Sequence, residues 1–120
     1  MRFDVELALT AQEQARGLMF RDQMARSAGM LFVYDRVAPV AFWMRNTLIP
    51  LDMVFIDDAG IVTKVHANAV PRDETPIPSG GPVRAVLEIN GGQAAQLGID
   101  AGDEVRSPIF PQAQAVWACD

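Results

Sequence analysis

The stretch LDMVFIDDAGIVTKVH, residues 51–66, decides the fold class of this chain. Two apolar runs, LDMVFI and IVTKVH, flank the turn sequence DDAG at residues 57–60. Acidic residues followed by glycine between two such runs are typical of the tight turn of a β-hairpin. We therefore predict two antiparallel strands joined at residues 57–60.

Further strands are predicted on both sides of this hairpin. Large apolar residues occupy every second position of residues 3–9, which is the period of a half-buried strand. Short apolar runs bounded by turn residues predict more strands; these are GMLFVY (29–34), VAFWM (40–44) and VRAVLEI (83–89). IDAGDEV (99–105) is expected to turn into a strand, and the apolar piece AVWA (115–118) to close the sheet. A short polar link separates the runs at 29–34 and 40–44, so we expect these two to pair.

Two short helices are predicted between the strands. Thr10 precedes Glu13 by three residues, the spacing of a capping box, and Gly17 supplies a left-handed stop, so TAQEQARG is expected to form one to two helical turns. A second short helix is predicted at residues 93–97, and a further helical turn near residues 22–25. Residues 68–82 hold four of the eight prolines and predict a surface loop.

The spacing of these elements indicates the fold class. Strands that recur about every ten residues, with only short helices between them, are typical of β-barrels and sandwiches. Parallel sheets need longer crossover connections, usually built on a helix. We therefore predict a mainly β, compact single-domain β-barrel or sandwich over residues 1–120, largely antiparallel, with one or two short helices.

The composition fits a single domain outside the membrane. The chain has 120 residues, half of them hydrophobic, which is enough for a core without metals or disulfides. Its apolar runs are far shorter than the roughly 18 to 20 residues that cross a bilayer, so no transmembrane segment is predicted. Cys119 is the only cysteine, which excludes an intrachain disulfide. Met1 leads directly into a strand-like run, so the protein is either cytoplasmic or has lost a leader.

The charged and metal-ligating residues exclude several classes of partner. The formal net charge is -5, and the basic residues are scattered, so no cluster exists to neutralise nucleic-acid phosphates. Tetrahedral zinc needs several histidine or cysteine ligands, and the chain has only His66 and Cys119. No glycine-rich phosphate loop precedes a helix. We therefore predict no nucleic-acid partner, no metal and no cofactor.

Asp52 and Glu88 are the candidate catalytic residues. A nucleophile held by a base is not indicated, because His66 is the only histidine and Ser79 lacks the context of a nucleophile elbow. Asp52 and Glu88 each lie between apolar neighbours on strands predicted to be central, as an acid/base pair would require. The alternative is that each is a structural carboxylate bonded to backbone amides or to arginine.

The stretch AFWMRNTLIPLD, residues 41–52, holds the candidate binding residues. Strand alternation predicts that Phe42 and Met44 face the core, while Trp43 shares the opposite face with Arg45. A tryptophan beside a cation presents both an apolar wall and a hydrogen-bond donor. We therefore predict that Trp43 contributes to a ligand surface rather than to the core.

The polar residues that follow Trp43 complete the predicted pocket. An aromatic face and planar amides suit a sugar or a peptide. Because a guanidinium is rarely buried without a carboxylate, Asp52 or Glu88 is expected to pair with Arg45 as the pocket floor. The predicted binding residues in this stretch are Trp43, Arg45, Asn46 and Thr47.

Five motifs together resemble one known family. They are GLMFR (17–21), GMLF (29–32), FWMRNTLIPLDMVFID (42–57), VLE (86–88) and LGIDAGDEV (97–105). In this order and spacing the chain is similar, from about residue 5 to residue 105, to the family named domain of unknown function 192. The resemblance implies a small, mainly β bacterial or archaeal domain, often behind a signal peptide or lipoprotein leader, with no established activity. It also adds Arg21, a signature position of the family, to the candidate binding residues.

Three functions follow as hypotheses. The first is a non-enzymatic domain that binds a small molecule, glycan or peptide; the resemblance implies that it is exported to the periplasm with its leader removed, the alternative being cytoplasmic. The second is a small hydrolase or lyase that uses the carboxylate pair Asp52 and Glu88. The third is an interaction module that offers an edge strand to a partner protein. The oligomeric state is not indicated by the sequence.

Overall fold

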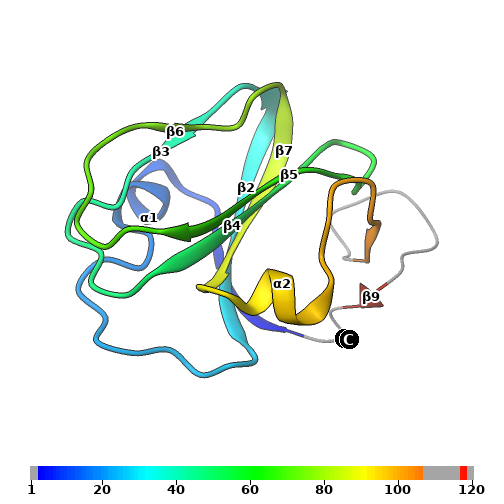
Figure 1. Cartoon of the computed structure of the whole chain (residues 1–120). Helices are drawn as coiled ribbons and strands as arrows, with labels where there is room; N and C mark the ends of the chain where they lie inside the picture. The colour runs from blue at the N-terminus through cyan, green and yellow to red at the C-terminus, as the bar shows by residue number, and fades with distance from the viewer. Residues whose placement is uncertain (1–2, 107–116, 119–120) are drawn as a thin grey trace.

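A mixed five-stranded sheet forms the centre of the molecule (Figure 1). The computed structural model describes residues 3–106 and 117–118. In spatial order the strands of this sheet are β1 (Asp4–Ala8), β2 (Ala28–Ala38), β7 (Val83–Asn90), β4 (Leu51–Ile56) and β5 (Val62–Ala69). The remaining elements are the helices α1 (Ala11–Arg16) and α2 (Gln93–Leu97) and the short strands β3 (Ala41–Phe42), β6 (Ile77–Pro78), β8 (Val105–Arg106) and β9 (Trp117–Ala118). The predicted mainly β domain with two short helices is confirmed.

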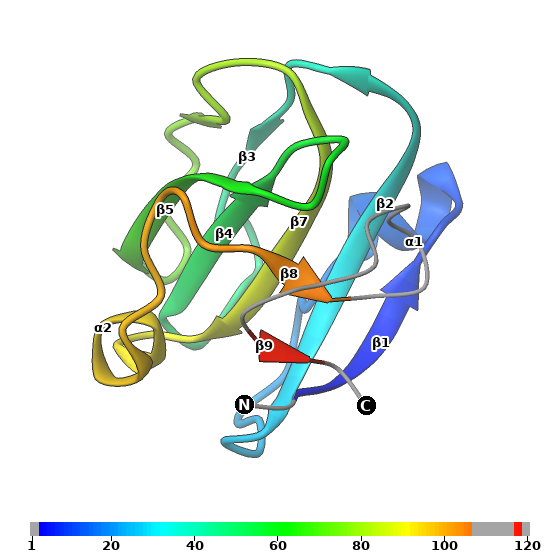
Figure 2. The same cartoon turned by 90° about the vertical axis from the view of Figure 1, so that its right-hand side faces the viewer.

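The sheet is open and largely antiparallel. In the described residues β1 and β5 end the strand order and are not bonded to each other, so no closed barrel forms. Its one parallel pair, β1 with β2, runs side by side (Figure 2) and is joined by a crossover that contains α1. A six-residue helix therefore suffices for this crossover, because the turns and irregular chain of residues 17–27 supply the remaining length. No helix in the described ranges is long and apolar enough to span a bilayer.

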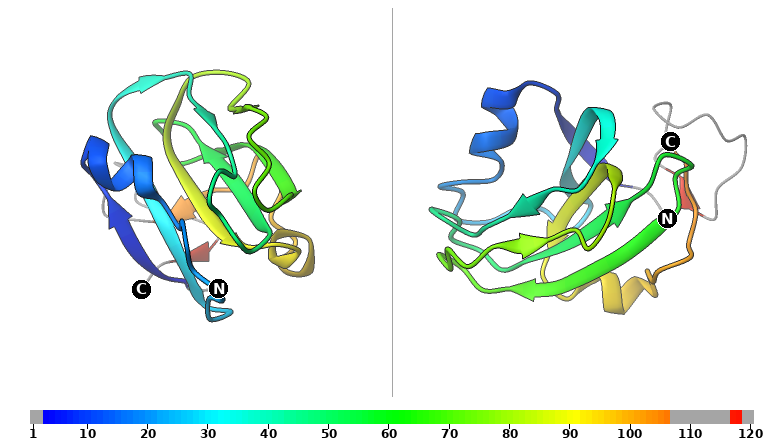
Figure 3. Two further views of the ribbon diagram at one scale, coloured as in Figure 1. Left: turned by 90° about the vertical axis from the view of Figure 1, so that its left-hand side faces the viewer. Right: turned by 90° about the horizontal axis from the view of Figure 1, so that it is seen from above.

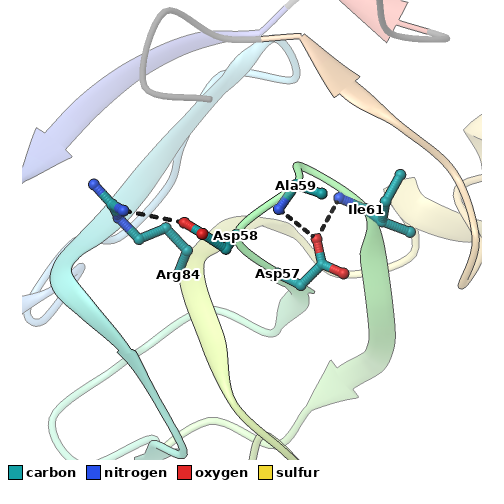
Figure 4. Close-up of polar contacts among 5 residues, drawn as sticks. All are labelled: Asp57, Asp58, Ala59, Ile61 and Arg84. Carbon is teal, nitrogen blue, oxygen red and sulfur yellow. Dashed lines mark hydrogen bonds and ion pairs between the residues drawn. The ribbon is translucent and has the colours of Figure 1, made fainter. Parts of the chain in front are cut away.

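The predicted hairpin at residues 51–66 is confirmed as β4 and β5. Its turn is stabilised by Asp57, whose Oδ1 accepts hydrogen bonds from the amides of Ala59 and Ile61 at 2.9 Å each (Figure 4). The next residue, Asp58, pairs with Arg84 of β7 at 3.2 Å. The acidic residues of the turn thus stabilise its backbone and connect it to the neighbouring strand.

Three local predictions were wrong. Residues 29–34 do not pair with residues 40–44; β2 bonds instead to β1 and β7, while β3 pairs with β6. Both edges of β2 are occupied by longer strands, so none is left for residues 40–44. The helical turn expected at residues 22–25 is absent. The surface loop predicted over residues 68–82 is interrupted by the end of β5 and by β6.

The sheet separates two apolar clusters, one on each face. Side chains alternate along β4 and β7, so neighbouring residues enter different clusters. Helix α2 covers one face and α1 the other (Figure 3). The α2 face is mainly aliphatic and includes Leu31, Val54, Ile56, Leu87, Ile89 and Ala94. The α1 face holds larger side chains, among them Leu18, Met30, Phe32, Met53, Phe55 and Val86.

Helix α1 begins with the predicted capping box. Thr10 Oγ1 accepts from the Glu13 amide at 3.1 Å, and Glu13 Oε1 accepts from the Thr10 amide at 3.1 Å. Thr10→Ala removes one of these bonds, so we expect the free energy of unfolding to fall by about 1 kcal/mol. Urea unfolding measures this loss. Gln12→Ala, an exposed change in the same helix, serves as the control, and equal effects of the two changes would contradict the cap.

Candidate functional site

A pocket of about 470 Å³ lies where α1 and the chain after it approach the sheet. Its volume is in the range of small-molecule sites. The walls are mainly apolar and aromatic, with a few polar groups among them. The lining includes Arg16, Phe32, Tyr34, Phe42, Trp43, Thr47 and Glu88.

Glu88 is the buried acid of this pocket. It lies on the central strand β7, directly across from Met30 of β2 and Met53 of β4, and only 4% of it is exposed. Its carboxyl group makes no hydrogen bond or ion pair with any described residue. Burial against these apolar neighbours raises the pKa of Glu88 to about 8. Near neutral pH the carboxyl group is therefore mostly protonated.

Tyr34 belongs to the same site. It follows Phe32 on one face of β2 and lines the pocket with Glu88. Burial raises the pKa of the Tyr34 phenol above its usual value, and the negative charge of Glu88 adds a smaller rise. The two groups therefore interact electrostatically within one pocket. Tyr34 was not among the predicted site residues, although its spacing from Phe32 places both on one strand face.

The aromatic side of the pocket is rigidly packed at its base. The rings of Phe32 and Phe42 meet edge to face with centres 5.0 Å apart, and Phe42 contacts Phe55 in the same way at 6.2 Å. Gln14 of α1 donates to the carbonyl groups of Ala8 and Val33. These contacts fix α1 against the sheet and hold the pocket walls in place.

Trp43 lies at the mouth of the pocket and is 43% exposed. Arg45 lies beside it, with its guanidinium carbon 5.3 Å from the centre of the indole ring. The expected ion pair between Arg45 and Asp52 or Glu88 is wrong, because neither carboxylate bonds to Arg45. The cation contacts the indole instead, and the acid of the pocket remains without a partner among the described residues.

Asn46 and Thr47 support the wall rather than point polar groups into the pocket. Thr47 is buried, and its hydroxyl donates to the Arg45 carbonyl at 3.1 Å. Asn46 is exposed, and its backbone carbonyl accepts a hydrogen bond from the backbone amide of Phe20 at 2.8 Å. Of these two residues only Thr47 lines the pocket.

Backbone hydrogen bonds join the three loops of residues 17–27, 43–50 and 70–76, and each loop holds one non-glycine residue with a left-handed backbone. These residues are Phe20 (φ 67°), Asn46 (φ 55°) and Arg72 (φ 66°). The Phe20 amide donates to Asn46, and the Arg72 amide donates to the Thr47 carbonyl at 3.0 Å. A left-handed conformation is strained for a bulky residue such as phenylalanine, and such strain concentrates at functional sites. The hydrogen bonds between the loops hold these conformations in place.

Asp52 lies on the opposite face of the sheet from Glu88. In the register of β4 and β7, Asp52 is paired with Ile89, whereas Glu88 is paired with Met53. The carboxylate of Asp52 accepts from three backbone amides, those of Asn68 (2.8 Å), Gly92 (3.0 Å) and Ala94 (2.8 Å). It therefore caps α2, and the two candidate catalytic carboxylates do not meet.

Arg21 lies outside the lining of the pocket. It forms an ion pair with Glu6 of β1, with one N···O distance of 2.8 Å. Within the described ranges no group of three or more histidine, cysteine, aspartate or glutamate side chains converges to hold a metal. Cys119 lies outside the described residues.

The match to a known family covers this whole site. The model of DUF192, described as Uncharacterized ACR, matches residues 1–107. The chain belongs to the DUF192 family. This membership confirms the resemblance seen in the five sequence motifs, and every lining residue of the pocket falls within the matched region.

Two solved structures of bacterial proteins resemble this one. A protein of unknown function from Novosphingobium aromaticivorans DSM 12444 is 54% identical, with a TM-score of 0.83 over 85% of this chain and 73% of that one. A "putative transcription regulator" from Sinorhizobium meliloti 1021 is 46% identical, with a TM-score of 0.84 over 85% and 79%. No curated protein matches the sequence.

Asp52 is expected to be structural. Asp52→Ala leaves three backbone amides, two of them partly buried and that of Ala94 fully buried, without their acceptor, so we expect the free energy of unfolding to fall by about 3 kcal/mol. Asp58→Ala, which removes an exposed aspartate from the same hairpin, should cost less than about 1 kcal/mol. Chemical unfolding of both variants tests the difference. Equal small effects would show that α2 does not depend on this cap.

Glu88 is expected to make stability depend on pH. Its pKa in the folded protein, about 8, exceeds the ordinary value of 4.5, so between these values the folded state holds a proton that the unfolded chain has lost. Stability from this source is fully present at low pH and is lost as pH rises towards 8. Relative to Glu88→Gln, the wild type should lose up to about 1.4 kcal/mol per pH unit across this window. Parallel unfolding curves at each pH would refute the shift.

Proposed function

We propose that this domain binds a small organic molecule in the pocket beside α1, without transforming it. The observation that supports this most directly is Glu88, a buried acid that lines an aromatic pocket and has no partner among the described residues. A buried polar group without a partner costs free energy, so it is retained where something else requires it. A ligand that bonds to Glu88 would supply that partner.

Binding is favoured over catalysis by the arrangement of ionisable groups. Acid/base catalysis commonly uses two groups whose pKa values are pushed apart. The pKa values of Glu88 and Tyr34 are both raised, and Asp52 is on the other face of the sheet. The hydrolase or lyase alternative therefore lacks its second group. A pKa near 8 does suit Glu88 as a lone general acid or base, so turnover of a bound ligand is the result that would favour that alternative.

Two further aspects of the proposal concern the setting of the domain. Export behind a leader, which the family resemblance implies, remains a prediction for this chain. The Sinorhizobium meliloti protein is described as a "putative transcription regulator", so regulation of transcription is a second candidate role for this domain. A ligand-sensing role would agree with the pocket, whereas direct contact with DNA is disfavoured by the net charge of -5.

Trp43 provides the test of the binding site. A fragment screen that follows backbone amide shifts by NMR should yield ligands that perturb the pocket residues. Trp43→Ala should abolish their binding while stability stays within about 1 kcal/mol, because the indole is already 43% exposed. A core tryptophan would instead cost about 3 to 5 kcal/mol on truncation.

Leu7→Ala is the matched control for this experiment. Leu7 is 48% exposed on β1 and does not line the pocket. This variant should bind the same fragments as the wild type. The proposal fails if no fragment perturbs the pocket, or if fragments bind Trp43→Ala as tightly as they bind the wild type.

A further inference from the structure

We propose that the ligand is an organic cation, a quaternary or alkyl ammonium whose charged head contacts the carboxyl group of Glu88 between the aromatic walls. This inference rests on the proposed binding function and names the chemistry of its ligand. It arises from three features of the pocket: an acid without a cation, walls made of aromatic rings, and few free hydrogen-bonding groups.

The positive charge that would pair with Glu88 is not supplied by the described residues. Arg16 lines the pocket, but its guanidinium carbon lies over the ring of Phe20, 5.9 Å from the ring centre. Arg45, which does not line the pocket, lies over Trp43. Both cations therefore have aromatic partners and neither pairs with Glu88. A cation from outside the described chain would complete the site.

The aromatic walls suit such a cation. Phe32, Tyr34, Phe42 and Trp43 line the same pocket as Glu88. The faces of aromatic rings carry partial negative charge and attract ammonium groups, most strongly where water is excluded. The carboxyl group of Glu88 among these rings adds a full negative charge to the same preference once it gives up its proton.

Other ligand chemistries fit less well. An anion would meet the acid of the pocket. A sugar needs several hydrogen-bonding groups, but the side chains of Gln14 and Thr47 are already bonded to backbone carbonyl groups. Glu88 and Tyr34 on the strands, and Arg16 on α1 with its guanidinium over Phe20, are then the ionisable side chains of the described pocket lining that remain free to bond a ligand. A single charged head group is a better match for them.

Binding of a cation should release a proton from Glu88. The ionisable side chains that share its pocket are Tyr34 from β2 and Arg16 from α1, while β4 presents Met53 on this face and Asp52 on the other. A bound ammonium favours the carboxylate form, so the proton that Glu88 holds in the free protein passes to the buffer. At neutral pH close to one proton should be released, and affinity should rise with pH until Glu88 is ionised in the free protein.

Isothermal titration calorimetry of the whole chain tests this inference. The probes are tetramethylammonium, choline and benzyltrimethylammonium, each compared with the neutral molecule in which carbon replaces nitrogen. Their charge does not change with pH, so any proton released comes from the protein. We expect at least one cation to bind about tenfold or more tightly than its neutral counterpart. Titrations in two buffers of different ionisation enthalpy should give the proton release.

Glu88→Gln keeps the shape of the side chain and removes its charge. This variant should lose both the preference for the cation and the release of a proton, while it still binds the neutral counterpart. Asp58→Asn, which removes an exposed carboxylate of the β4–β5 turn, should behave as the wild type. Thermal unfolding of each variant checks that the fold is retained.

The outcomes separate this inference from the proposed function. Equal affinity for cations and neutral counterparts, tighter binding of anions, or unchanged cation binding by Glu88→Gln would each overturn the inference and leave a binding pocket in place. The same holds if none of these cations binds while the NMR screen finds other ligands. If that screen finds no ligand of any charge, the proposed function fails and the inference fails with it.

Discussion

The antiparallel pairing of β4 with β7 is the constraint on which the rest of the structure depends. These two strands are buried almost throughout, and their register places Met53 opposite Glu88. Because side chains alternate across a strand, the same register turns Asp52 towards α2. A slip of one residue in β4 would place Asp52 on the α1 face and leave the first amides of α2 without their acceptor. Both the helix and the pocket therefore depend on this one alignment.

The two buried carboxylates show how environment decides the role of a residue type. Asp52 accepts three short hydrogen bonds from backbone amides, so its burial is compensated within the protein. Glu88 is almost as deeply buried but lies between two methionines and accepts no hydrogen bond from any described residue. Burial without compensation favours the protonated form and raises the pKa. Asp52 thus belongs to the fold, whereas Glu88 is the residue whose presence calls for a functional explanation.

The sequence predicted the local elements well because their signals span only a few residues. The capping box at Thr10 and the DDAG turn are each complete within about five positions, and both were found where expected. The pairing of β2 was missed because it depends on β7, some fifty residues away, rather than on its neighbour in the chain. Trp43 and Glu88 could be named as candidates, but the pocket they share is assembled from α1, β2, β3 and β7. Sequence periodicity gives the face of each strand and does not say which helix covers it.

The strained loops explain how the pocket can remain open. A cavity lined by large apolar groups tends to close when its walls can move, because collapse removes apolar surface from water. Here the wall at Trp43 is held by Phe20, Asn46 and Arg72, whose left-handed backbones are fixed by hydrogen bonds to one another or to Thr47. Each non-glycine residue in this conformation costs of order 1 kcal/mol or more, and asparagine least. A wall that is strained and tightly bonded keeps its shape before a ligand arrives. Less of the binding free energy is then spent on ordering the site.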